Sequence, residues 1–245
     1  MSTDIRANLD AERLATGFFE QTWQPIIANQ PEAVRSHLAA ERVLVAALLA
    51  DSGYRTVVEA GCADGSLLAS VILNAGVGYL GLDVADGAVR ACAAALRDLA
   101  ESAGRPLPPA VARRADIRDL AAVLGGRGAP STPPVLTAFP FNVFGNIPEP
   151  RHALKAAASV SADALILTYD TSTDARALRD EYYRACGFAG VFTVDEAGVH
   201  YEDGLFTSSV YREPVLTGWL EELGYAVTVT PYGRVGLAYH GRRGR

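Results

Sequence analysis

A glycine turn between an apolar run and a helix-like segment holds the residues best suited to bind a ligand. The run 56–60 contains Glu59 and is followed by Gly61, Ala63 and Gly65, and then by an apolar stretch typical of a helix. Glycine permits backbone angles and a close ligand approach that a side chain would prevent. A helix that begins directly after such a turn presents free N–H groups and a positive dipole end. We therefore predict a ligand site at this turn, suited to a carboxylate or phosphate.

Three polar side chains elsewhere are expected at the same place. Asp83, Asp116 and Asn142 each stand at or just after the end of a short apolar run. Open α/β sheets bind ligands beyond the carboxyl ends of their strands. If these runs are parallel strands, all three side chains lie at the sheet edge that holds the glycine turn.

The fold class follows from the alternation of short apolar runs with helix-like segments. Five strands are predicted in this part of the chain, at 56–60, 78–83, 110–114, 134–139 and 164–168. Such alternation implies a parallel sheet covered on both faces. The runs 226–230 and 234–239 are joined by only three residues and must be antiparallel. The predicted fold is a doubly wound α/β fold whose seven-stranded, mostly parallel sheet has an antiparallel last strand.

Two segments fall outside this alternation. Helical spacing of apolar residues predicts an N-terminal helical cap over 1–53 that ends at Gly53, although helices that only cover a sheet edge explain it equally well. The α/β domain that contains the glycine turn is predicted to span residues 54–245. Between 171 and 211 a helical piece and a predicted β-hairpin interrupt the alternation. We expect this insertion to supply walls of a substrate site.

Composition excludes several classes of protein. The 245-residue chain carries a net charge of −6 with no block of basic residues, which argues against a nucleic-acid partner. Its N-terminus lacks the apolar region of a signal peptide, and no apolar run is long enough to span a bilayer. The three cysteines are widely spaced, which indicates a reducing compartment and neither a zinc site nor a disulfide framework. The expected location is the cytoplasm.

The spacing Gly61-x-Ala63-x-Gly65, with Glu59 two residues ahead, departs from the dinucleotide fingerprint G-x-G-x-x-G. It resembles the first motif of class I S-adenosylmethionine-dependent methyltransferases, with Ala63 in place of the middle glycine. The resemblance covers about residues 54–170 and 213–240 and includes the antiparallel end of the sheet.

This resemblance implies S-adenosylmethionine as cofactor and assigns roles to individual residues. Glu59 would position the cationic methionyl end, Asp83 the ribose hydroxyls, and Asp116 the adenine. The full set of implied cofactor-binding residues is Glu59, Gly61, Cys62, Ala63, Gly65, Asp83, Val84, Asp116, Ile117 and Pro140. Simpler structural roles compete: a loop carboxylate for Asp83, a helix N-cap for Asp116 and a loop cap for Asn142.

A second, local resemblance lies in the segment 139–146. Its sequence, Phe-Pro-Phe-Asn-Val-Phe-Gly-Asn, looks like the Phe-Pro-Gly-Ser-Thr-Ile-Gly-Asn stretch of histidine N-methyltransferases. The four central residues all depart from that pattern, and no counterpart of that family's substrate-binding region is present. The histidine substrate is therefore not carried over.

The candidates for catalysis are His200 and Asn142. A histidine titrates near neutrality and can act as a general base, and His200 lies in the predicted insertion. The alternative is a merely exposed side chain on a hairpin. The remaining histidines, in weaker context, are His37, His152 and His240. The aromatic residues of the insertion would line a pocket or form its own core: Tyr182, Tyr183, Tyr201, Phe206 and Tyr211.

Taken with the resemblance, these residues predict a methyltransferase that acts on a small-molecule N- or O-nucleophile without a metal ion. Three alternatives stay open. The cofactor could serve structurally in a cyclisation or rearrangement, the protein could be a nicotinamide-dependent oxidoreductase, or it could be a non-enzymatic binding module. The missing G-x-G-x-x-G and the antiparallel end of the sheet argue against the oxidoreductase.

Overall fold

The computed structural model describes residues 30–126, 132–160, 162–204 and 207–244. Its centre is a seven-stranded sheet with the order β3-β2-β1-β4-β5-β10-β9. The strands are β1 (Thr56–Ala60), β2 (Gly78–Asp83), β3 (Ala110–Arg114), β4 (Val135–Phe139), β5 (Asp163–Tyr169), β9 (Tyr225–Tyr232) and β10 (Gly236–Arg243). The first five pair in parallel, whereas β10 runs antiparallel to both β5 and β9. The predicted fold class is confirmed.

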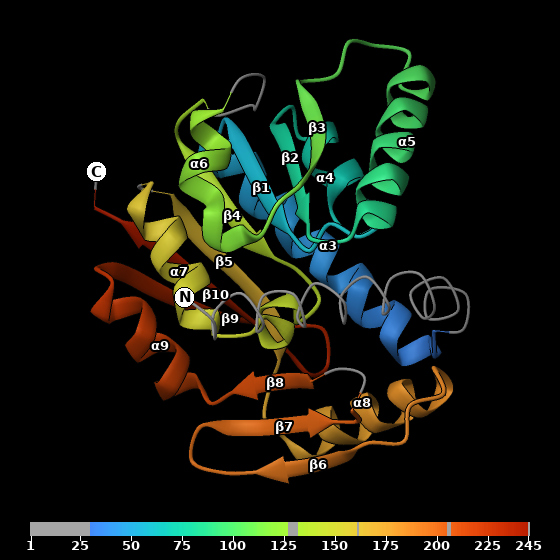
Figure 1. The fold of residues 1–245 in the computed structure, drawn as a ribbon, viewed down its shortest axis with the longest axis vertical. Helices are drawn as coiled ribbons and strands as arrows, with labels where there is room; N and C mark the ends of the chain where they lie inside the picture. Colours follow the sequence, from blue (N-terminus) through green and yellow to red (C-terminus); the bar gives the residue numbers. More distant parts are fainter. Residues whose placement is uncertain (1–29, 127–131, 161, 205–206, 245) are drawn as a thin grey trace, which may run out of the picture.

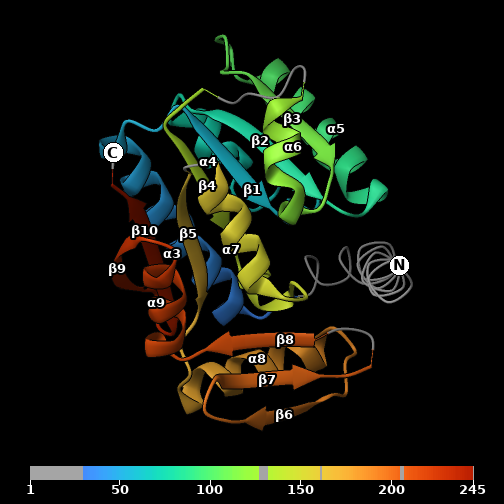
Figure 2. The same ribbon diagram turned by 60° about the vertical axis from the view of Figure 1, so that its left-hand side comes forward.

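Helices cover both faces of this sheet (Figures 1 and 2). They are α3 (Glu32–Ser52), α4 (Ala69–Asn74), α5 (Asp86–Ser102), α6 (Leu120–Gly125), α7 (Pro150–Ser159) and α9 (Glu213–Glu222). One apolar core joins the sheet to α3, α4 and α5, and a second joins it to α6, α7 and α9. Because both faces are covered, every residue of β1, β4 and β5 is buried, as expected for apolar runs of parallel strands.

The helix α3 packs on the sheet. Val34, Leu38, Val45 and Leu49 of α3 belong to the core that covers one face. The helix ends at Gly53, which adopts a left-handed φ of 68°, as the sequence predicts. The rest of the predicted cap lies outside the described residues. The described part of this region therefore acts as a cover for the sheet.

The insertion is a small layer of its own below the main sheet (Figure 1). The helix α8 (Thr173–Ala185) is followed by an antiparallel sheet of β6 (Val191–Val194), β7 (Gly198–Glu202) and β8 (Thr207–Tyr211). The predicted hairpin is present as β6 and β7. The third strand, β8, is not predicted because its Thr-Ser-Ser start lacks an apolar pattern, yet Ser208 is buried.

The helix after the glycine turn differs from the prediction. It begins at Ala69, whereas the apolar stretch that directly follows Gly65 predicts an earlier start, near Ser66. The side chain of Arg42 on α3 donates hydrogen bonds to the backbone oxygens of Ser66 and Leu67, at 2.9 and 3.1 Å. Within the described ranges, no helix is long and apolar enough to cross a membrane.

Candidate active site

The glycine turn after β1 is built from left-handed residues. Gly61, Ala63 and Gly65 have φ angles of 64°, 46° and 79°. A Cβ at Gly61 would lie 2.7 Å from Cγ1 of Val143, so glycine is required there by packing as well as by conformation. Ala63 keeps the left-handed turn although it carries a side chain. This geometry explains how alanine occupies the middle position of the motif.

The turn is joined to the end of β2 by Asp83. One oxygen of this carboxylate accepts a hydrogen bond from the backbone N–H of Ala63 at 3.0 Å, and the other accepts from the N–H of Ala85 at 2.9 Å. Burial raises the pKa of Asp83, against the lowering effect of these N–H donors. Asp83 thus has the structural role of a loop carboxylate. A carboxylate can accept about four hydrogen bonds, so Asp83 can also accept from further donors.

Two other implied cofactor residues are turned into the protein interior. Glu59 is fully buried and accepts a hydrogen bond from the hydroxyl of Tyr79 at 2.7 Å. Its burial raises its pKa well above the ordinary value. Cys62 is also fully buried, with its side chain beside Gly81 of β2. These side chains lie beneath the turn and support it.

Asp116 has the structural role that the sequence leaves open. It is the N-cap of η2 (Ile117–Asp119), accepting from the N–H of Arg118 at 2.8 Å, and it pairs with the Arg118 guanidinium at 2.7 Å. Burial raises its pKa, but the Arg118 contacts outweigh this and lower it overall. Ile117 is buried in the core beneath α6 and α7. Val84, half-buried, lies directly after Asp83.

The loop after β4 is the second unusual backbone segment at this edge. Phe141 and Asn142, directly after Pro140, both adopt left-handed φ angles, 44° and 58°. The N–H of Phe141 donates to the Glu41 carboxylate of α3, and the N–H of Asn142 donates to the backbone oxygen of Leu167 at 2.8 Å. Residues of two other segments, α3 and β5, therefore hold this loop in a conformation that side-chain-bearing residues rarely adopt.

The Asn142 side chain joins the main sheet to the insertion. Its Nδ2 donates to Oγ of Ser208 at 3.0 Å, and its Oδ1 accepts from Oγ1 of Thr168 at 2.5 Å. The side chain is buried. Both ends of the amide are thus occupied by protein partners, which is the geometry of a structural bridge between β5 and β8.

A buried polar cluster, which the sequence analysis does not predict, lies behind the same loop. Glu41 accepts hydrogen bonds from the N–H of Phe141 at 3.1 Å and from the hydroxyl of Tyr232 at 3.0 Å. His37, one turn earlier on α3, has its Nε2 3.3 Å from that hydroxyl and stacks on Tyr169 with 4.6 Å between ring centroids. The sequence signal that could have revealed this cluster is a pair of polar residues, His37 and Glu41, spaced four apart on the apolar face of a helix.

Burial shifts the pKa values of this cluster in opposite directions. It raises the pKa of Glu41 to about 7, although the Tyr232, Phe141 and Arg42 groups lower it. Burial lowers the pKa of His37 to about 4, against the raising effect of Asp170. Both groups are therefore predominantly neutral at mildly acidic pH.

His200, the predicted general base, is held within the insertion. Its Nδ1 lies 2.9 Å from Oγ of Ser209 and its Nε2 lies 3.0 Å from Oδ1 of Asp195. The ring makes an edge contact with Tyr211. These contacts connect His200 to its own small sheet; it is His37 that contacts the groups holding the loop after β4.

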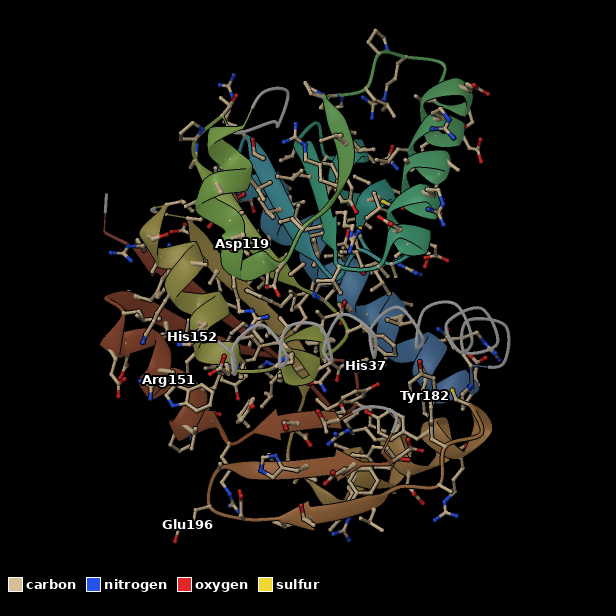
Figure 3. The ribbon with its side chains drawn as sticks, in the orientation of Figure 1. His37, Asp119, Arg151, His152, Tyr182 and Glu196 are labelled. Atoms are coloured by element: carbon tan, nitrogen blue, oxygen red, sulfur yellow. The ribbon has the colours of Figure 1, made fainter. Side chains whose placement is uncertain are left out.

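The other two histidines lie elsewhere. His152 is exposed on α7 beside Glu149, and Figure 3 shows it with Arg151 well away from His37 and Tyr182. His240 lies on β10, with its Nε2 2.8 Å from the hydroxyl of Tyr54.

The aromatic residues of the insertion mainly form its core. Tyr183 and Tyr201 pack together with 4.4 Å between centroids, and both contact Phe192. Tyr182 instead faces the main domain, 5.7 Å from Phe141. Tyr211 contacts Phe144 and Trp219. Phe206 lies outside the described residues.

Solved structures that resemble this chain in fold include several methyltransferases. A magnesium protoporphyrin IX methyltransferase from Synechocystis PCC 6803 with bound S-adenosylmethionine gives a TM-score of 0.61 at 16% identity, over 96% of this chain and 97% of that one. A methyltransferase from Aquifex aeolicus gives 0.53 at 15%, over 88% and 95%. A DhpI–SAM–HEP complex gives 0.53 at 15%, over 99% of both chains. The class I methyltransferase fold predicted from the glycine turn is confirmed.

Comparison at the level of sequence gave no match. Neither a scan against protein-family models nor a search of curated proteins found a similar sequence. The similarity to the methyltransferases is therefore one of fold.

Proposed function

We propose that this protein is an S-adenosylmethionine-dependent methyltransferase that acts on a small-molecule N- or O-nucleophile. The observation that carries the proposal is the hydrogen bond between Asp83 and the N–H of Ala63. It joins the end of β2 to the left-handed turn after β1, so the two parts of the predicted cofactor site form one unit. The fold and the loop after β4 at the same edge support it.

The donor set fits this cofactor. The Asp83 carboxylate accepts two backbone N–H bonds and has the capacity to accept two more from ribose hydroxyls. Glu59 is fully buried beneath the turn and bonded to Tyr79, so in this proposal it supports the turn from below and makes no direct contact with the methionyl end. Among the described residues no group of three or more His, Cys, Asp or Glu side chains is placed to hold a metal ion.

When bound, the cofactor supplies a sulfonium methyl group already activated for displacement. The work of the protein is then to orient the acceptor in line with that methyl group and to exclude water. In this proposal the loop 140–142 lies on the acceptor side. Phe141, buried against Tyr182 and Tyr169, forms an apolar wall there. His200 and Asn142 enter as candidates for acceptor contacts.

The test is calorimetric titration of the purified protein with S-adenosylhomocysteine, with NAD as the control ligand. We expect binding of the first and none of the second. Replacing Asp83 with Ala should weaken the affinity about tenfold or more, because a charged hydrogen-bond acceptor is lost. Unchanged affinity in Asp83→Ala would refute the ribose role, and binding of NAD alone would refute the cofactor class. Formation of S-adenosylhomocysteine in an acceptor screen distinguishes methyl transfer from a structural use of the cofactor.

A further inference from the structure

Two neighbouring residues of α3 contact the two loops of the predicted cofactor site. Glu41 accepts a hydrogen bond from the N–H of Phe141 in the loop after β4. Arg42 donates to the backbone oxygens of Ser66 and Leu67, directly after the glycine turn. The two loops are far apart in sequence, and one helix turn bonds to both. A helix that only covered the sheet would be expected to carry an apolar residue at the buried position of Glu41.

We propose that Glu41 and Arg42 are positioning residues that fix the loops after β4 and β1 relative to each other, and so set where the acceptor meets the methyl group. The proposal rests on the function proposed above. Neither residue is placed in contact with cofactor or acceptor. Each acts through a backbone group of the loop that it holds.

The Glu41 contact is the more demanding of the two. Its side chain is 1% exposed, and a buried carboxyl is costly unless its hydrogen bonds compensate for the lost water. The bond goes to a residue with φ 44°, a conformation that needs support from its surroundings. The Tyr232 hydroxyl, which donates to Oε2 of Glu41, fixes the carboxyl from the other side.

Both hydrogen bonds between Glu41 and other side-chain or backbone groups come from donors, Phe141 and Tyr232. An ionised carboxylate accepts from Phe141 and Tyr232 together, whereas a protonated one accepts from Phe141 through its carbonyl oxygen and can donate its O–H to the Tyr232 oxygen. The ionisable groups that face Glu41 come from four elements: His37 and Arg42 on α3, Glu59 on β1, Tyr169 on β5 and Tyr232 on β9. Burial raises the pKa of Glu41 to about 7, and in either protonation state one carboxyl oxygen is able to accept from the N–H of Phe141.

The experiment compares Glu41→Leu, Glu41→Gln and Arg42→Met with wild type and with Glu32→Gln, an exposed glutamate of the same helix. Hydrogen exchange resolved by peptide is measured first. Glu41→Leu should speed exchange about tenfold or more in the segment 140–142 and leave 63–68 unchanged; Arg42→Met should do the reverse. Glu41→Gln should leave both segments protected, because the Gln oxygen still accepts from the N–H of Phe141. Glu32→Gln should also leave them protected, because Glu32 contacts neither loop.

Affinity for S-adenosylhomocysteine between pH 6 and 8 is measured next. Glu41→Leu and Arg42→Met should weaken it about tenfold. Equal exchange in both segments for each variant, or a lower melting temperature with unchanged affinity, would overturn the positioning role. If wild type binds no S-adenosylhomocysteine, the proposed function fails, while the exchange data still decide whether these residues hold the loops.

Discussion

The opposite pKa shifts of Glu41 and His37 predict a pH dependence of stability that only variants reveal. The pKa of Glu41 is raised from 4.5 to about 7, so its protonated form stabilises the fold. That contribution is complete below pH 4.5 and is lost as the pH rises to about 7. The pKa of His37 is lowered from 6.5 to about 4, so its neutral form stabilises the fold. That contribution is present above pH 6.5 and is lost as the pH falls to about 4.

The two effects have similar size and opposite slope. A shift of this extent corresponds to about 3 kcal/mol for each group, at about 1.4 kcal/mol per pKa unit. Between pH 4.5 and 6.5 they nearly cancel in the wild-type protein. Both side chains are at least 97% buried, so solvent screening does not remove the effect.

Replacing either residue should reveal the pH-dependent contribution of the other to the unfolding free energy. Relative to wild type, Glu41→Gln should gain about 3 kcal/mol of unfolding free energy between pH 4 and 8. Replacing His37 with Phe, which keeps a ring to stack on Tyr169, should lose about the same amount relative to wild type between pH 4 and 7.

The assay is urea denaturation of the full chain at unit steps of pH, with the m-value checked at each step. Glu32→Gln is the control, because that glutamate is exposed on the same helix and its pKa is lowered by Arg35; its difference from wild type should stay flat above pH 5. A Glu41→Gln difference that is constant from pH 4 to 8 would show that the buried carboxyl does not titrate in this range, and the reasoning would be wrong.

Two further predictions concern the left-handed backbone at Ala63 and the hydrogen-bonded bridge formed by the Asn142 side chain. Ala63→Gly should raise the unfolding free energy by up to about 1 kcal/mol, because glycine adopts the left-handed φ of 46° without the cost that a Cβ brings; urea denaturation checks this, and a loss of stability would mean that Ala63 is not strained. Asn142→Leu should lower the unfolding free energy by about 2 kcal/mol or more, since Thr168 and Ser208 lose a buried hydrogen-bond partner. Hydrogen exchange should also become faster across β8. Exchange protection of β8 equal to that of wild type would contradict the bridge.

The sheet could be predicted because its signals are local. Continuous apolar runs gave β1, β2, β4 and β5 close to their observed bounds, since strands buried on both faces need apolar residues throughout. The three-residue link gave the antiparallel end. The strand β8 lacks such a signal: its buried Ser208 is stabilised by Asn142, Tyr183 and Arg179, which lie far away in sequence.

The site was only half predictable for a similar reason. The glycine turn and Asp83 are bonded to each other as the motif implies, because their geometry depends on a few residues of one βαβ unit. The histidine behind the loop after β4 carries no such local signal. The sequence favours His200 in the insertion, whereas His37 touches the residues that hold that loop. Whether His200 takes part in catalysis stays a prediction.

The loop 140–142 shows why a motif search cannot describe this side of the site. Its N–H groups bond to Glu41 of α3 and Leu167 of β5, and its asparagine bonds to Ser208 of the insertion. None of these partners belongs to a recognisable sequence motif, and only the fold brings them together at the loop. A substitution in α3 or in the insertion can therefore alter the acceptor side without touching the loop itself. Under the proposed function, acceptor specificity would then change through distant residues while the glycine turn and Asp83 stay the same.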